Sequence, residues 1–184
     1  MLKSKKLLSL ILTLVMVVSL FTLSVSASAL DSGYTVTIYV QEAARDVDDN
    51  IEYSYVWTDT PIVVPVESGS TLKEAIQAAA SQGQIISNDE WYDNNGNPDT
   101  EWLSSLTLTE YDLTYTNENN FYYDYPEPGL ATYEGFSWMY FNGTPDDMPS
   151  SAYAYPSVSL GSQTVTGNVT ITLSFEYLTY VWEY

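Results

Sequence analysis

The sequence predicts an α+β fold that is mostly β-strand, with a mixed sheet packed on one helix. Two observations lead to this prediction. Several runs alternate apolar and polar residues with the two-residue period of a half-buried strand, and the cleanest of them covers residues 169–177. One stretch, at about residues 71–82, instead has the capping residues and the apolar spacing of a helix.

The first predicted strand covers residues 35–40, where apolar and polar side chains alternate. Residues 53–57 and 61–66 follow, and both segments are rich in β-branched and aromatic side chains. The second of these segments contains two prolines. Because proline cannot donate a hydrogen bond to a neighbouring strand, the prolines predict an edge position.

The predicted helix begins with a capping box, in which Thr71 and Glu74 each satisfy a free backbone amide. One narrow apolar stripe follows at helical spacing, made of Leu72, Ala75, Ile76 and Ala79. Gly83 is a natural end for this helix.

Residues 84–130 are predicted to be an inserted loop and hairpin region. Within it, residues 106–115 predict a strand or hairpin, residues 117–120 a turn, and residues 122–129 an aromatic loop interrupted by prolines. After this region the strand pattern returns. Residues 136–141 lead into the tight-turn signal Asn142-Gly143, and the alternating run over residues 169–177 closes the pattern.

The order of these elements resembles the small β-grasp-like domain at the C-terminus of transcobalamin and intrinsic factor, and the bacterial secreted domains of unknown function grouped with it. The matching stretches are residues 63–75, 135–143 and 169–177. The resemblance implies a β-grasp-like fold and an extracellular binding role, with a cobalamin-like small molecule as one ligand class. Residues 84–130 depart from the family pattern, in which the helix leads more directly to the aromatic strand.

The first 29 residues predict a secretory signal, since three lysines precede an apolar run over residues 7–23 and the small-residue site Ala27-Ser28-Ala29. Residues 30–184 then suit a single domain. An uncleaved N-terminal anchor is the alternative. The absence of cysteine favours a secreted bacterial protein, because small extracellular animal domains usually carry disulfides.

The composition excludes several classes of function. Without the signal, the chain has two basic residues, Arg45 and Lys73, and 24 acidic residues, which gives a formal net charge of −22. Such a chain does not bind nucleic acid, because polyphosphate recognition needs clustered Lys and Arg. The lack of His and Cys excludes the usual zinc sites, thiol nucleophiles and triads with an imidazole base.

A calcium site is one hypothesis, since oxygen-bearing side chains recur at every second position of a loop. The candidate ligands are Asp93, Asn95, Asn97, Asp99 and Glu101. A solvated turn is the alternative, because the same residue types are common turn formers and the spacing departs from that of an EF-hand. No other cofactor is predicted.

Aromatic residues are the most distinctive feature, with 17 Tyr and 5 Trp in the chain. Those in turn-rich or irregular stretches predict exposed rings that contact a ligand, because Tyr combines flat apolar area with a hydroxyl group. The candidate ligand-binding residues are Tyr122, Tyr123, Tyr125, Trp138, Tyr153 and Tyr155. The alternative is that these rings cover the inserted region.

No complete catalytic set is present. Ser70 and Lys73 have the Ser-x-x-Lys spacing of penicillin-recognising enzymes, but helix capping accounts for this segment. Paired carboxylates could serve a glycan hydrolase, although no spacing selects two of them. The sequence therefore predicts a secreted, non-enzymatic binding or adhesion module that contacts a glycan or protein through Tyr-rich loops. A cobalamin-like carrier and a hydrolase are the alternatives.

Overall fold

Two β-sheets and one α-helix make up the part of the chain that the structure, a computed structural model, describes: residues 33–58, 60–92, 101–110, 112–124 and 127–184. The strands are β1 (Tyr34–Arg45), β2 (Ile51–Val56), β3 (Ile62–Val66), β4 (Ile86–Tyr92), β5 (Trp102–Leu108), β6 (Leu113–Thr116), β7 (Glu118–Tyr123), β8 (Leu130–Asn142) and β9 (Val169–Glu183). The helices are α2 (Leu72–Ser81) and the 3-10 helices η1 (Pro145–Asp147) and η2 (Ala152–Ala154). The predicted fold class, mostly β with one helix, is confirmed at this level.

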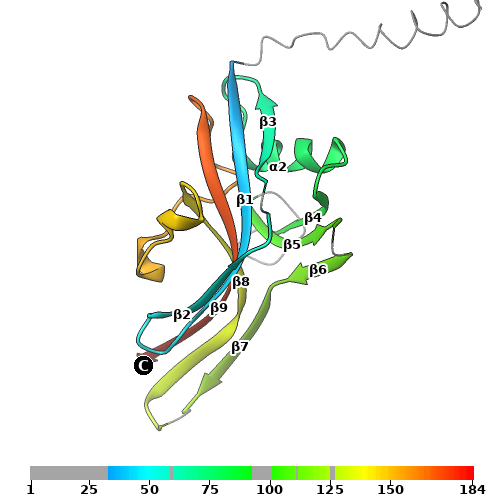
Figure 1. Cartoon of the computed structure of the whole chain (residues 1–184). Helices are drawn as coiled ribbons and strands as arrows, with labels where there is room; N and C mark the ends of the chain where they lie inside the picture. Colours follow the sequence, from blue (N-terminus) through cyan, green and yellow to red (C-terminus); the bar gives the residue numbers. More distant parts are fainter. Residues whose placement is uncertain (1–32, 59, 93–100, 111, 125–126) are drawn as a thin grey trace, which may run out of the picture. The chain divides into compact units, whose positions relative to one another are not determined.

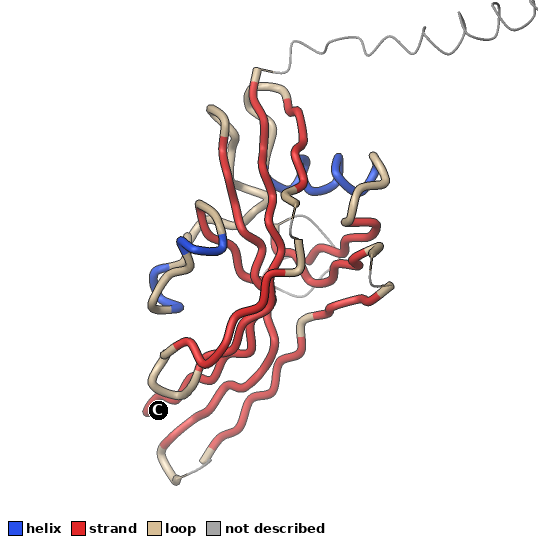
Figure 2. The backbone as a smooth tube through the Cα atoms, in the orientation of Figure 1, coloured by secondary structure: helices blue, strands red, loops and turns tan. Residues whose placement is uncertain are grey.

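The larger sheet, called the main sheet below, has the strand order β2-β1-β9-β8-β7, and β3 also pairs with β1 (Figures 1 and 2). β1 and β9 run parallel in the middle of this sheet, from Val36 opposite Val169 to Ala44 opposite Tyr177. The pairs β1–β2, β1–β3, β7–β8 and β8–β9 are antiparallel. β1 and β9 are thus hydrogen-bonded to each other although most of the described sequence separates them.

Two short strands share the outer edge of β1. β3 pairs with the first half of β1, and β2 pairs with the second half. In the described part of the chain β3 pairs with β1 alone, as its prolines predicted. Together the two strands cover an edge that would otherwise expose unpaired backbone groups.

The helix is confirmed with its predicted cap. Thr71 Oγ1 accepts a hydrogen bond from the Glu74 amide at 3.2 Å, and the Glu74 carboxylate accepts one from the Thr71 amide at 2.7 Å. The four residues of the predicted apolar stripe are all buried. They pack against the main sheet, and the small size of the two alanines permits a close approach.

The main core lies between one face of the main sheet, α2 and a three-stranded sheet of β4, β5 and β6. An aromatic cluster, called the core cluster below, is part of this core. It consists of Trp57, Tyr115, Phe136, Trp138 and Phe175. Trp57 stacks on Tyr115 with 4.2 Å between ring centroids, and the Trp138 indole N–H donates to the Tyr115 carbonyl at 3.0 Å. Figure 1 shows α2 and β4 to β6 beside one half of the main sheet, while β2, β7 and the ends of β8 and β9 run on beyond them.

The region of residues 84–130 is more regular than predicted. The hairpin is present as β5 and β6, but the prediction of a turn over residues 117–120 is wrong, because β7 begins at Glu118. The prediction that residues 122 and 123 lie in a loop is wrong for the same reason. Pairing with β8 supplies backbone partners for this polar segment, and that outweighs its turn-forming composition.

A single asparagine makes the change of sheet between β6 and β7. The Asn117 side-chain amide donates to the Leu103 carbonyl at 3.1 Å, and its carbonyl oxygen accepts from the Trp138 amide at 2.8 Å. One side chain thus ties the smaller sheet to β8.

Among the residues that the structure describes, none of the helices has both the length and the apolar character needed to cross a membrane.

Candidate functional site

A groove of about 510 Å³ lies over β7, β8 and β9, on the face of the main sheet opposite α2. We call it the aromatic groove. Its described lining residues are Phe121, Tyr133, Ser137, Met139, Tyr153, Leu178, Tyr180 and Trp182. All but Tyr153 come from the three strands, and Tyr153 reaches the groove from η2.

Strand register explains why these side chains share one face. Tyr133 on β8 is opposite Phe121 on β7 and Tyr180 on β9, so the three rings form a row across the sheet. The Tyr133 ring centroid lies 5.1 Å from that of Phe121 and 6.0 Å from that of Tyr180. Tyr153 extends the row, with its ring centroid 5.8 Å from that of Tyr180.

Gly135 leaves room for the Tyr133 ring. It pairs with Leu178 and occupies the position between Tyr133 and Ser137 on the same face of β8. Because glycine has no side chain, the Tyr133 ring can extend along the strand past residue 135 towards Ser137. The Ser137 hydroxyl lies 2.9 Å from the Tyr133 hydroxyl, which gives the floor a polar pair in an otherwise apolar lining.

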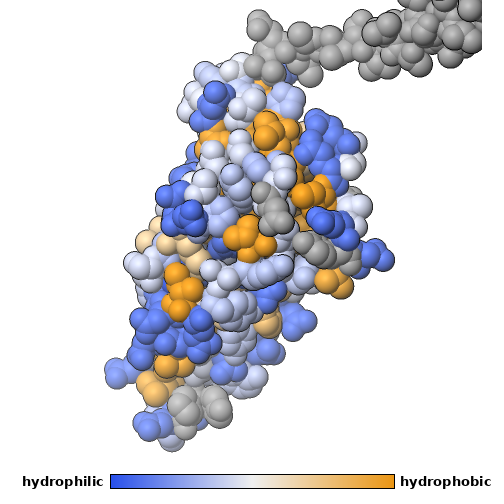
Figure 3. All heavy atoms as spheres, viewed as in Figure 1, coloured by the Kyte–Doolittle hydropathy of each residue, from blue (hydrophilic) through white to orange (hydrophobic). Residues whose placement is uncertain are grey.

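Several of the rings are open to solvent. The exposed fraction is 82% for Tyr153, 60% for Phe121 and 39% for Trp182. Such rings are accessible to a ligand without any rearrangement. In Figure 3 hydrophilic residues cover most of the visible face and hydrophobic ones form separate patches.

Two further rings lie beyond this row, further along the strands at the free end of the sheet. Tyr123 packs edge-on against Tyr184, with 5.6 Å between centroids. The Tyr184 hydroxyl donates to the Asp124 carboxylate, and this bond, together with one from the Gly129 amide, lowers the pKa of Asp124. The carboxylate at this end of the groove is therefore held in its charged form.

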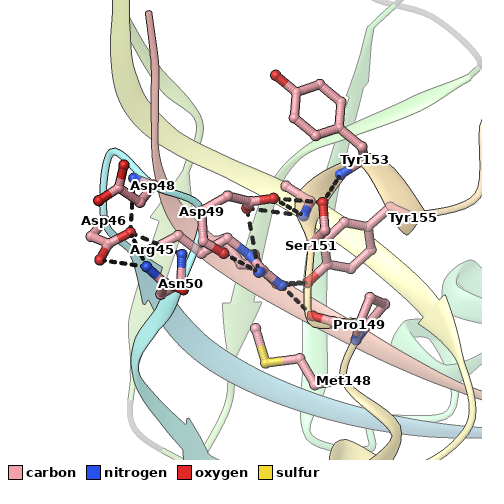
Figure 4. Close-up of polar contacts among 12 residues, drawn as sticks. Arg45, Asp46, Asp48, Asp49, Asn50, Met148, Pro149, Ser151, Tyr153 and Tyr155 are labelled. Carbon is pink, nitrogen blue, oxygen red and sulfur yellow. Dashed lines mark hydrogen bonds and ion pairs between the residues drawn. The ribbon is translucent and has the colours of Figure 1, made fainter.

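A buried polar cluster borders the other end of the groove (Figure 4). Arg45 Nε donates to Glu176 at 3.1 Å, and both side chains are inaccessible to solvent. The Tyr155 hydroxyl donates to the same carboxylate, and the Arg45 guanidinium lies 5.6 Å from the Tyr155 ring centroid. Burial, with the negative charge of Glu176, raises the pKa of Tyr155, so this phenol stays neutral.

Asp49 connects this cluster to the groove. Its carboxylate lies 3.4 Å from Arg45 and accepts hydrogen bonds from the Ser151 hydroxyl at 2.6 Å and the Ala152 amide at 3.0 Å. These bonds fix the start of η2, which carries Tyr153. Figure 4 shows the Tyr153 ring pointing away from the Arg45 cluster.

The carboxylates of Asp49 and Glu176 add negative potential at Tyr180 in the groove. Burial raises the pKa of Tyr180 to about 12, and the charges of Asp49 and Glu176 contribute to the rise, while Arg45 opposes it. The same negative potential that disfavours a phenolate favours a positive group on a bound molecule.

The predicted ligand-binding residues are dispersed. Tyr153 lines the groove, and Tyr123 lies on the same face just beyond it. Tyr122 points to the opposite face of β7, because successive side chains of a strand alternate. Tyr125 lies outside the described residues.

Trp138 and Tyr155, which are also among the predicted ligand-binding residues, are both buried. Trp138 is 7% exposed and belongs to the core cluster, and Tyr155 is 8% exposed with its hydroxyl on Glu176. The expectation of an exposed ring at Tyr155 is wrong. Tyr155 contacts the ion pair of Arg45 and Glu176, two residues that are far apart in the chain. The local sequence around Tyr155 does not reveal this contact.

Four of the five predicted calcium ligands, Asp93, Asn95, Asn97 and Asp99, lie outside the described residues. Glu101 is described, and its carboxylate lies 3.4 Å from the hydroxyls of both Ser159 and Ser162. Within the described ranges no group of three acidic side chains is arranged to hold a metal ion. The calcium hypothesis thus gains no support from Glu101.

Sequence reasoning missed most of the groove, namely Phe121, Tyr133, Tyr180 and Trp182. A signal was present in β9. The even-numbered residues of this strand are polar from Thr170 to Glu176. From Leu178 to Trp182 the even-numbered residues are apolar or aromatic. A switch of this kind indicates that the second face of the strand acquires apolar neighbours.

Comparison of the chain with family models, with curated proteins and with solved structures finds no match.

Proposed function

We propose that this protein is an extracellular, non-enzymatic binding module that holds a glycan in the aromatic groove. The observation that supports this best is the row of partly exposed rings from Tyr153 to Phe121. Sugar rings have apolar C–H faces that stack on aromatic side chains, and their hydroxyls need hydrogen-bonding partners. The Tyr hydroxyls of the groove supply such partners.

The lining chemistry favours binding over catalysis. None of the described lining residues carries a carboxylate or an amine, and Ser137 is paired with the Tyr133 hydroxyl. Hydrolysis of a glycosidic bond ordinarily needs two carboxylates on either side of the scissile bond. A glycan held over these rings therefore meets apolar faces and phenol groups, and no acid–base pair.

We also propose that the scaffold that carries the groove is a β-grasp-like domain. It is supported by the parallel pair of β1 and β9 in the middle of the sheet, and by α2 following the antiparallel pair of β1 and β3. The same likeness keeps a cobalamin-like ligand as the alternative function. Titration of cobalamin into the protein with absorbance detection tests that alternative, which fails if the spectrum stays additive.

Affinity electrophoresis tests the proposed function. The protein is run through native gels that contain hydroxyethyl cellulose, mannan, dextran or glycol chitosan, and its mobility is compared with that in a plain gel. We expect retardation by at least one polymer. The double variant Tyr153→Ala/Trp182→Ala should lose most of the retardation, because it removes the rings at the two ends of the groove.

The matched control is Tyr55→Ala. Tyr55 is 60% exposed on β2, at the opposite edge of the main sheet, so its removal tests whether any exposed ring suffices. Circular dichroism and thermal melting establish that each variant is folded. If no polymer retards the protein, or if the Tyr55 variant loses retardation as much as the groove variant, the proposed function is wrong.

A further inference from the structure

We infer that the glycan bound in the aromatic groove carries protonated amino groups, so that the preferred ligand is a cationic amino-sugar polymer. This inference rests on the proposed function and specifies its ligand class. Carboxylates lie at the two ends of the groove, and aromatic rings lie between them.

One end of the groove carries an excess of negative charge. Arg45 is a single cation, yet it faces the carboxylates of both Glu176 and Asp49. Asp46 and Asp48 belong to the same turn, and bonds from Asn50 lower the pKa of Asp46. Asp49 contacts the start of η2, and the four carboxylates of this cluster and its turn outnumber the single Arg45 charge by three.

The far end is negative as well. Asp124 accepts a hydrogen bond from Tyr184, whose ring lies beyond the row of rings at the free end of the sheet. Apart from Arg45, the only cationic side chain in the described ranges is Lys73. It lies over the Trp91 ring, and its backbone belongs to α2 on the other face of the main sheet. An ammonium group in the groove thus meets carboxylates at both ends.

The rings between these ends suit the same charge. Aromatic faces attract ammonium groups, because the ring quadrupole is negative above the plane. An acidic glycan would meet repulsion from the carboxylates at both ends. A neutral glycan would gain the stacking alone. An amino-sugar polymer gains stacking and charge attraction together, and this selects it among the glycans.

The test compares two ligands that differ only in the nitrogen group of each sugar, which is a protonated amine in one and a neutral acetamide in the other. Hexaglucosamine and hexa-N-acetylglucosamine are titrated calorimetrically into the protein at about pH 5.5, where carboxylates are ionised. We expect hexaglucosamine to bind about tenfold more tightly at low ionic strength. This advantage should shrink as salt is added, because exposed charges are screened.

Two matched double variants locate the effect. Asp48→Asn/Asp124→Asn neutralises one exposed acid at each end of the groove and should weaken hexaglucosamine binding about threefold or more. Glu67→Gln/Glu110→Gln changes the net charge equally at exposed positions outside the groove and should have little effect. Asparagine at residue 124 keeps the left-handed backbone conformation that Asp124 has there.

The outcomes separate this inference from the proposed function. Equal affinity for the two hexamers, or loss of binding in the Glu67/Glu110 variant, overturns the inference while the binding module stands. Hexaglucosamine binding that survives Tyr153→Ala/Trp182→Ala overturns it too, because the attraction would then not involve the groove. Failure of every polymer in the electrophoresis gels overturns the proposed function itself.

Discussion

The core cluster and the aromatic groove use the same kinds of side chain on the same two strands, yet one is sealed and the other open. Trp138 and Phe175 lie beneath the smaller sheet, while Tyr180 and Trp182 lie further along β9 on the opposite face, where the described residues form no second sheet over them. Aromatic residues in a strand therefore do not define a core by themselves. A second layer of structure decides whether they stabilise the fold or remain available to a ligand.

The largest effect that separates the two regions should come from truncating one ring in each. Phe175→Ala removes a buried ring that contacts Phe136, Trp138 and Tyr115, and should cost about 3–5 kcal/mol of unfolding free energy. Trp182→Ala removes a partly exposed ring and should cost about 1 kcal/mol or less. Urea denaturation measures both. Equal costs would mean that the groove is part of the core.

The buried ion pair at the border of the groove gives the next effect. Arg45→Met leaves Glu176 buried without its cation and should cost about 3 kcal/mol, because an uncompensated buried charge is strongly unfavourable. Lys73→Met is the matched control. Its ammonium lies 5.0 Å from the Trp91 ring centroid, and its loss should cost about 1 kcal/mol or less. A small effect at Arg45 would show that water reaches Glu176.

The smallest effect concerns alkaline pH. Because the pKa of Tyr180 is raised to about 12, its neutral form contributes stability that is complete below the unfolded value of about 10 and is lost as the pH rises towards 12. Tyr180→Phe should make stability less dependent on pH in this window. It should also remove one late-titrating phenol from an ultraviolet absorbance titration, and an unchanged late step would contradict the assignment.

The parts of the fold that could be predicted from the sequence are those that local contacts determine. Helix α2 is one example, since Thr71 and Glu74 satisfy each other and the apolar stripe is continuous. Strand β7 could not be predicted, because its polar residues become a strand only through pairing with β8. The burial of Tyr155 likewise depends on Arg45 and Glu176, which are far from it in the chain.

The candidate site shows the same limit. Tyr153 was accessible to sequence reasoning because it lies in an irregular segment rich in aromatic residues. The other groove rings lie in regular strands, where a ring is ordinarily assigned to the interior. Their exposure follows from the register that aligns Phe121, Tyr133 and Tyr180, and from the lack of a covering layer among the described residues.

The parallel pairing of β1 with β9 has a consequence for how the chain acquires its structure. Gln41 and Ser174, whose side chains are hydrogen-bonded, are 133 residues apart. Contacts of such separation are formed slowly, because a long loop must close before any gain is made. Until β9 pairs with β1, one edge of β1 has no neighbouring strand. The main sheet thus stays incomplete until β9 joins β1.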